Sequence, residues 1–425
     1  MLLGKQFTNG KLGDLYFEFK HKSGLTILIY PKEEYTTAYA VFGTNYGSID
    51  TFIRNQEGAP TRIVEGTAHY LEHKLFESEE LDAFARFAET GASANAYTSF
   101  DKTCYLFSCS DHFNENLEIL LDFVQHPYFT EETVQKEQGI IGQEIRMYQD
   151  EPGWQVMFNL LRCLYHNHPV KIDIAGTVES ISHIDADLLY KCYDQFYNLD
   201  NMVLAVVGGV TCGQVIDVAD KVLETCTPAP VKRMDYNEPR DVVRSSFTEE
   251  FPITMPSFLL GFKETHDTPQ RTLKEKLITG ILMDYIAGET SPLYNRLLDE
   301  GLINGTFGYE YFTGPGFALT MFGGDSRDPE KVAEELKKEI ARVREEGLDF
   351  MEFNRLVKAA YGKAVMSYND IDGLANELVS SYFEGYHLFE ELELYRSMTV
   401  EEAEAQLRTQ MVEQYSALSV VKPQE

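Results

Sequence analysis

The chain has 425 residues, of which 44% are hydrophobic and 25% are charged, so a disordered or fibrous protein is excluded. No run of about 18 apolar residues occurs and the first residues do not resemble a signal peptide, which excludes a membrane span and predicts a cytoplasmic protein. The formal net charge of −31 disfavours nucleic acid and anionic lipid as partners; it either serves solubility alone or favours basic peptides.

The first half of the chain alternates between strand and helix patterns. Strands are predicted at 25–30 and 37–43, a helix at 64–77, a second helix ending at Gly91, and two paired strands at 92–98 and 103–109. Asp111 is expected to cap a helix that ends before Pro127. Thr130 is expected to open the next helix, because two glutamates follow it in the first turn.

A linker and two weak repeats indicate an internal duplication. Residues 227–244 are rich in proline and charge and lack apolar periodicity, so they are interpreted as a linker between domains at 1–226 and 245–425. The sequence LAVV at 204–207 matches LSVV at 418–421, an offset of 214. The helical pattern at 129–150 also resembles that at 350–371, at an offset of 220 or 221.

The second half repeats this alternation. Helices are predicted to start at Thr268-Pro269, at Asp328-Pro329 and at a capping box formed by Thr399 and Glu402. The expected fold class is therefore α+β, with two similar α/β sandwich domains of about 200 residues each. Their mixed or antiparallel sheets are expected to pack against helices.

Cysteine spacing bears on metal and redox chemistry. No Cys-x-x-Cys pair is present, so neither a zinc ribbon nor a redox motif is indicated. Unpaired, buried thiols in a reducing compartment are expected instead. The six cysteines are Cys104, Cys109, Cys163, Cys192, Cys212 and Cys226.

The most informative segment is HYLEH at 69–73. On a helix, His69 and His73 are four residues apart and project from the same face, a spacing that suits two nitrogens bound to one zinc ion. Glu72 lies beside them and is placed to accept a proton from water. The alternative is an amphipathic helix with ordinary surface residues, but the surrounding sequence is largely apolar. The segment is the inverted zinc motif H-x-x-E-H.

A catalytic zinc site usually has three protein ligands, so a third is required. The helix pattern at 137–147 offers Glu137 and Glu144, seven residues apart and on one face. Gly139 and Gly142 lie between them, and close packing against another helix is expected to explain both glycines. The alternative for this pattern is a solvated stripe of glutamates.

The H-x-x-E-H motif, with a distal glutamate at 144, resembles the pitrilysin/insulysin family of inverted zinc peptidases. Within the family, the chain is most similar to two-domain, processing-peptidase-like bacterial members. The resemblance covers essentially the whole chain and extends to GASANAYTSFDKT at 91–103, to HP at 168–169 leading to GT at 176–177, and to the strand at 203–208.

The resemblance implies a metal site and its surroundings. It makes His69, His73 and Glu144 the ligands of one zinc ion per chain, Glu72 the general base, and Glu137 a carboxylate that orients a ligand.

The resemblance also implies a place for the substrate. Asn95 and Ala96 would lie on an edge strand that receives a peptide as an added strand. For Asn95 alone, a hydrogen-bonded turn residue is the alternative interpretation.

The second half departs from the pattern of the family. It contains no H-x-x-E-H, and neither repeat register places a carboxylate opposite Glu137 or Glu144. The family usually supplies an Arg and a Tyr, seven residues apart, that hold the scissile carbonyl; Leu297 and Asn304 stand at these positions here. Nearby residues with suitable side chains do not stand at the expected positions; they are Arg296, Tyr309 and Tyr311.

The resulting hypothesis is a zinc endopeptidase that cleaves peptides or unfolded segments. It would act as a homodimer, or as a heterodimer with a similar chain that lacks the zinc motif but supplies the Arg and Tyr. Two alternatives remain. One is a non-catalytic structural or chaperone-like subunit that binds peptides without hydrolysing them. The other is a module for one precursor peptide that is hydrolytic only when paired.

Overall fold

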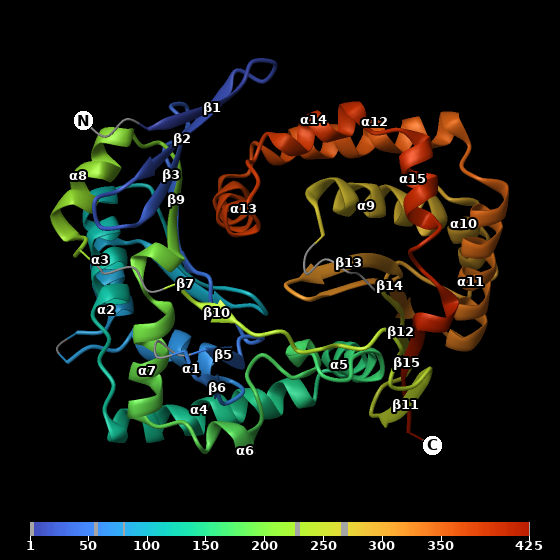
Figure 1. Ribbon diagram of the computed structural model, residues 1–425, viewed down its shortest axis with the longest axis horizontal. Helices are drawn as coiled ribbons and strands as arrows, with labels where there is room; N and C mark the ends of the chain where they lie inside the picture. The colour runs from blue at the N-terminus through green and yellow to red at the C-terminus, as the bar shows by residue number, and fades with distance from the viewer. Residues whose placement is uncertain (1–3, 55–57, 80, 226–229, 265–270, 425) are drawn as a thin grey trace. The chain divides into compact units, whose positions relative to one another are not determined.

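The structure is a computed structural model that describes residues 4–54, 58–79, 81–225, 230–264 and 271–424 (Figure 1). The chain divides into two compact units, each of which combines a sheet with helices. Unit 1 comprises residues 1–145, 173–234 and 366–390, and unit 2 comprises residues 146–172, 235–365 and 391–425. The predicted α+β class is confirmed. The domain boundaries at 226 and 245 stay a prediction, because the compact units take segments from both sides of them.

Unit 1 contains a seven-stranded sheet in the order β1-β2-β3-β9-β4-β8-β7. Only β3 and β9 are parallel neighbours, and every other pair is antiparallel. The strands are β1 (Lys5–Asn9), β2 (Asp14–Lys20), β3 (Thr26–Pro31), β4 (Ala38–Thr44), β7 (Ser93–Thr98), β8 (Thr103–Cys109) and β9 (Met202–Gly208). The buried strands β4 and β9 form its centre, so this sheet is the rigid base of the unit.

Seven helices of unit 1 bury apolar residues in one core that includes residues of this sheet. They are α1 (Thr67–Leu75), α2 (Ala83–Thr90), α3 (Phe113–Gln125), α4 (Glu131–Gln149, which ends in unit 2), α6 (Val178–Ile181), α7 (Ala186–Phe196) and α8 (Cys212–Val222). The unit also contains α13 (Ile371–Glu384), whose buried residues are not part of this core. A small separate sheet has the order β10-β5-β6, with β5 (Phe52–Arg54), β6 (Pro60–Arg62) and β10 (Lys232–Arg233). β10 lies inside the predicted linker.

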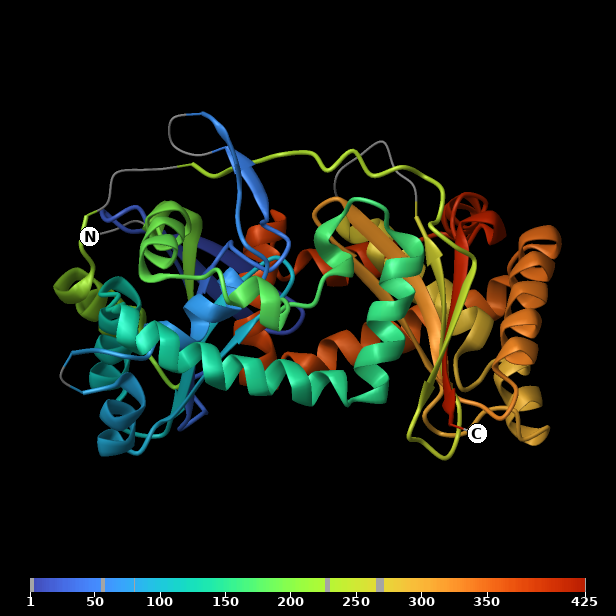
Figure 2. The same ribbon diagram turned by 90° about the horizontal axis from the view of Figure 1, so that it is seen from below.

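Unit 2 repeats the central part of this plan, as the labels of Figure 1 allow the reader to follow. Figure 2 shows the same ribbon, in the same colours, turned by 90°. Its sheet has the order β11-β15-β12-β14-β13, and again only one pair, β11 and β15, is parallel. The strands are β11 (Ser246–Phe251), β12 (Ser257–Lys263), β13 (Gly308–Gly314), β14 (Phe317–Asp325) and β15 (Ser416–Pro423). The helices are α5 (Pro152–Leu164), α9 (Leu273–Ala287), α10 (Pro292–Asp299), α11 (Pro329–Glu346), α12 (Phe350–Ser367, which ends in unit 1), α14 (Glu390–Ser397) and α15 (Val400–Leu407).

The matching strand orders confirm the predicted duplication. β3-β9-β4-β8-β7 corresponds to β11-β15-β12-β14-β13 in order and in direction. The two repeats found in the sequence fall on corresponding elements, LAVV in β9 and LSVV in β15, and the helical repeat falls on α4 and α12.

Each sheet is covered by one helix from the other half of the sequence. α13 packs on β4 and β9 in unit 1, and α5 packs on β12 and β15 in unit 2. Two glycines at corresponding strand positions allow the close approach. A Cβ atom at Gly43 would lie 2.8 Å from Cγ1 of Val379 in α13, and one at Gly261 would lie 2.8 Å from Cδ2 of Leu160 in α5. Glycine at these two positions therefore leaves room for α13 and α5 to lie close to their sheets.

Gly43→Ala is expected to destabilise unit 1 by about 1–3 kcal/mol, because the added methyl group overlaps Val379 and forces the packed helix to shift. Gly10→Ala is a matched control, since a Cβ atom there meets nothing within 4 Å. Urea unfolding followed by circular dichroism measures both. Equal unfolding midpoints for Gly43→Ala, Gly10→Ala and the wild type would contradict the packing explanation.

Most element predictions are confirmed, and two need comment. Gly91 ends α2 with φ 73°, and the caps at Asp328 and Thr399 are present. The cap predicted at Asp111 is wrong: His112 is the N-cap of α3, with φ 53°, and Oδ1 of Asp111 accepts a hydrogen bond from the backbone of His112 instead. The helix start predicted at Thr268-Pro269 lies outside the described residues, and α9 begins after a capping box at Thr272.

Two further expectations concern thiols and membranes. The five described cysteines are unpaired, and all are buried except the half-buried Cys212; Cys226 lies outside the described residues.

Among the described helices, none combines the length and the apolar character needed to cross a bilayer.

Candidate metal centre

The motif H-x-x-E-H lies on α1, as predicted. Gly66 precedes the helix with φ 90°, and a Cβ atom there would lie 2.5 Å from the carbonyl oxygen of Ala175, so only glycine fits. Tyr70 and Leu71 are fully buried and anchor the helix in the core of unit 1. The hydroxyl of Tyr70 donates to the backbone carbonyl of Val134 in α4, which joins the two helices.

The side chains of α1 and α4 bring three potential ligands together. Nε2 of His69 is 3.7 Å from Oε1 of Glu144, and Nε2 of His73 is 3.4 Å from Oε2 of Glu144. One ligand atom from each of the three residues lies within 4.8 Å of the other two. A tetrahedral zinc ion with bonds of about 2.0–2.1 Å separates its ligand atoms by about 3.3–3.4 Å. Two imidazole nitrogens and a carboxylate at this spacing fit zinc.

Glu137 supports one of the imidazoles. Its Oε1 lies 2.9 Å from Nδ1 of His73, on the side of the ring opposite Nε2. A carboxylate that accepts from one ring nitrogen fixes the orientation of the imidazole and leaves the other nitrogen available for a metal. Glu137 is buried on α4, two helical turns before Glu144.

The electrostatics of the centre favour a cation. Burial alone would lower the pKa of His73, but hydrogen bonds to Glu137 and Glu144 raise it to about 10. Hydrogen bonds from His69 and His73 hold the pKa of Glu144 far below its usual range. Together with Glu72, the centre carries three carboxylates around two imidazoles, so a divalent ion would compensate their charge.

Glu72 is held by a residue that sequence analysis did not single out. The hydroxyl of Thr98, the last residue of β7, donates to Oε2 of Glu72 at 2.9 Å. β7 is the end strand of its sheet and pairs only with β8 among the described strands. Asn95 and Ala96 therefore lie on an edge strand, as the resemblance to the family implies, and Oδ1 of Asn95 accepts from the backbone of Ala96 at 2.9 Å. Their contact with substrate stays a prediction.

Two details near the centre differ from the sequence interpretation. Lys74 is fully buried beside His73, where the sequence suggests an apolar stretch, and its ammonium group pairs with Glu77. The packing explanation for Gly139 is wrong, because this residue is exposed and a Cβ atom there would meet nothing within 4 Å. Gly142 is buried, as expected.

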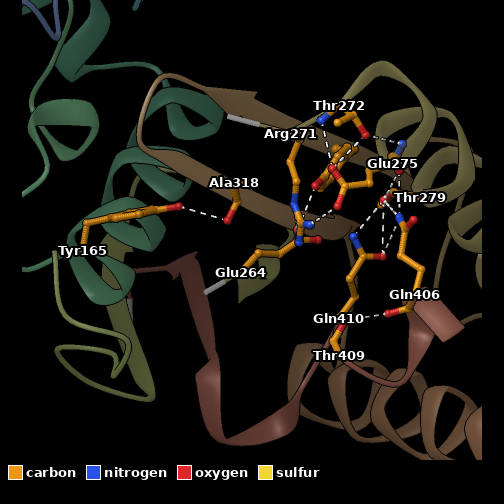
Figure 3. Close-up of polar contacts among 11 residues, drawn as sticks. Tyr165, Glu264, Arg271, Thr272, Glu275, Thr279, Ala318, Gln406, Thr409 and Gln410 are labelled. Carbon is orange, nitrogen blue, oxygen red and sulfur yellow. Dashed lines mark hydrogen bonds and ion pairs between the residues drawn. The ribbon is translucent and has the colours of Figure 1, made fainter. Parts of the chain in front are cut away.

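The corresponding place in unit 2 holds an ion-pair cluster (Figure 3). α9 corresponds to α1, and Tyr311 on β13 corresponds to Thr98 on β7 through the strand registers. The hydroxyl of Tyr311 donates to Oε2 of Glu264. The guanidinium of Arg271 bridges Glu264 and Glu275, as Figure 3 shows. The described part of unit 2 contains no group of three residues suited to hold a metal.

The residues in place of the Arg and Tyr of the family have structural contacts. Leu297 is fully buried in the core of unit 2, and Oδ1 of Asn304 accepts from the backbone of Thr306 at 2.8 Å. An arginine at position 297 would bury an unpaired charge, so such a variant would report on folding and not on chemistry.

The three nearby residues that do not stand at the expected positions also have carboxylate partners. Arg296 pairs with Glu335 at 2.6 Å, and the hydroxyl of Tyr309 donates to Asp284 at 2.9 Å. Tyr311 is bound to Glu264.

Known proteins match both halves of the chain. The model of the insulinase family, peptidase family M16, matches residues 60–178, and that of the peptidase M16 inactive domain matches residues 183–360. The second match agrees with the missing metal motif of the second half.

Individual relatives cover nearly the whole chain. The uncharacterised zinc protease YmfH of Bacillus subtilis is 39% identical over 398 residues, which are 92% of each chain. A solved protein of Alicyclobacillus acidocaldarius, described as an M16-like peptidase, is 36% identical and superposes with a TM-score of 0.93 over 100% of this chain and 99% of its own. A protease of Helicobacter pylori, 17% identical, shares the fold with a TM-score of 0.84 over 96% of this chain and 100% of its own. The chain therefore belongs to the insulinase family of peptidases, family M16.

Proposed function

We propose that this chain is a zinc-dependent endopeptidase that cleaves peptides or unfolded protein segments, and that it is the metal-bearing subunit of a dimer. The observation that carries the proposal is the convergence of His69, His73 and Glu144 with Glu72 beside them. Relatives that are named zinc proteases support the same chemistry.

The chemistry follows from the side chains. A bound zinc ion supplies the Lewis acidity that polarises a peptide carbonyl and acidifies water. Glu72 accepts the proton of the attacking water on a carboxylate oxygen and returns it to the leaving amine. His73 keeps one nitrogen on Glu137, so its ring stays in one orientation. The substrate lies along the free edge of β7, where backbone hydrogen bonds at Asn95 and Ala96 hold it extended.

The dimer is proposed because this chain lacks the Arg and Tyr that hold the scissile carbonyl in the family. An oxyanion donor is worth about 10²–10³ in rate. Leu297 is buried, and Arg296, Tyr309 and Tyr311 are engaged by carboxylates within unit 2. In a heterodimer, a similar chain without the zinc motif would supply the Arg and Tyr. In a homodimer, other residues would have to fill that role. The unpaired thiols of the described chain are consistent with a cytoplasmic location.

The first experiment is cleavage of a peptide library by the purified chain, read by mass spectrometry, with zinc content measured on the same sample. We expect one zinc ion per chain, new peptide termini that disappear on chelation, and recovery when zinc is returned. The same assay on the complex purified from the native host tests the dimer: faster cleavage than by the chain alone supports a distinct partner.

Two results would contradict the proposal. If the chain binds no zinc, the metal assignment is wrong. If it binds zinc but neither the chain nor its native complex cleaves any peptide, the non-catalytic, peptide-binding alternative holds.

A further inference from the structure

One hydroxyl group connects the proposed general base to the strand that is proposed to bind substrate. Thr98 is the last residue of β7, and its Oγ1 donates to Oε2 of Glu72 at 2.9 Å. A threonine hydroxyl has one proton to donate, so this contact uses it. Glu72 is ionised when it acts as a base, and a hydrogen bond to a charged acceptor is stronger than one between neutral groups.

Thr98 is itself held rigidly. It pairs with Thr103 across the β7–β8 ladder, and Oγ1 of Thr103 lies 3.5 Å from its own Oγ1. Thr103 is fully buried and donates to the backbone carbonyl of Tyr46 at 2.9 Å. The turn that follows is closed by a hydrogen bond from the backbone of Ser99 to that of Lys102 at 2.8 Å. The hydroxyl therefore has a fixed position relative to the edge of β7.

The corresponding residue of unit 2 makes the same kind of contact. Tyr311 occupies in β13 the register position that Thr98 occupies in β7, and its hydroxyl donates to the buried carboxylate of Glu264 at 2.8 Å. In both halves, this position of the end strand carries a hydroxyl that binds a carboxylate.

We propose that Thr98 is a positioning residue for Glu72, an inference that rests on the proposed function. Its hydroxyl holds Oε2, so that Oε1 points to the water that loses its proton. Because the same strand presents Asn95 and Ala96 to the peptide, Thr98 sets the distance between the bound substrate and the base. Loss of the hydroxyl leaves the strand edge and the metal ligands in place, so it reduces turnover and not binding.

The test compares Thr98→Val, which keeps the shape and removes the hydroxyl, with Thr98→Ser, which keeps the hydroxyl. We expect Thr98→Val to lower kcat about 10- to 100-fold with unchanged KM and zinc affinity, as for other residues that orient catalytic groups. Thr98→Ser should recover most of the wild-type kcat. Thr61→Val on β6 is a matched control for loss of a strand threonine hydroxyl, and it should leave all three quantities unchanged.

A purely structural role predicts a different result. It would lower the unfolding midpoint of Thr98→Val or raise KM, and Thr98→Ser would not restore kcat selectively. In a Glu72→Gln background the hydroxyl has no base to position, so adding Thr98→Val should cause no further loss of residual turnover. A further loss there would overturn the inference.

A readout that does not need activity separates this inference from the proposed function. In crystal structures of the zinc-loaded proteins, we expect Glu72 to adopt one conformer in the wild type and several in Thr98→Val. If Glu72 keeps the same conformer in Thr98→Val, the inference is wrong, whether or not the chain cleaves peptides. If the conformers spread as expected but the wild type is inactive, the proposed function alone fails.

Discussion

Glu72→Gln is expected to lower kcat by about 10²–10⁴-fold, because a glutamine amide cannot accept the proton of the attacking water. Zinc content should stay at the wild-type level, since the ligand atoms belong to His69, His73 and Glu144. Glutamine has nearly the same shape, and its amide oxygen can still accept the hydrogen bond from Thr98. The measurement is steady-state cleavage of a peptide found in the library experiment, with metal analysis of the same preparation.

Glu89→Gln is the matched control for this change. Glu89 is an exposed residue of α2 in the same unit, and its substitution removes the same charge without touching the centre. Turnover of Glu72→Gln at the rate of Glu89→Gln would show that another group accepts the proton. Loss of zinc from Glu72→Gln alone would instead place Glu72 among the ligands.

The metal centre could be anticipated from the sequence because its elements are local. The spacing of His69 and His73 follows from the pitch of one helix, and the seven-residue spacing of Glu137 and Glu144 follows from that of another. The contact between these two helices, which includes the hydrogen bond from Tyr70 to α4, does not follow from either spacing. Only the resemblance to a family indicates that the two helices form one site.

Other features had no local signal. Thr98 lies 26 residues from Glu72, and strand periodicity does not indicate which hydroxyl meets which carboxylate. The sequence also does not indicate that α5 and α13 each pack on the sheet of the other half of the chain. The apolar face of a helix predicts that it packs on a sheet, but it does not indicate which sheet. Gly43 and Gly261, two glycines inside strand patterns, were the available hint, since such glycines mark a close approach by another element.

The cluster around Arg271 is a feature of the second half that the sequence does not predict. The sequence shows that H-x-x-E-H is missing there. Instead, unit 2 has an ion pair between Arg271 and Glu264, two residues that belong to no recognised motif (Figure 3). The guanidinium of Arg271 lies between the carboxylates of Glu264 and Glu275 and supplies the positive charge that they need.

The last prediction separates the two glutamates of α4. Glu144→Gln is expected to lose zinc on dialysis and all detectable cleavage, because a neutral amide replaces the one anionic ligand, whose carboxylate lies 3.4 Å and 3.7 Å from the two imidazole nitrogens. Glu137→Gln is expected to keep zinc but to bind it about 10- to 100-fold more weakly, because it alters only the partner of His73. Competition with a chromogenic chelator measures both affinities.

These variants control for each other, because each removes one carboxylate from the same face of the same helix. Similar unfolding midpoints in urea would show that any difference in zinc affinity arises at the metal. Equal losses of zinc would mean that both carboxylates bind the ion directly. If Glu137→Gln loses zinc while Glu144→Gln keeps it, the roles assigned from the distances are reversed, and the orientation of His73 by Glu137 must be abandoned.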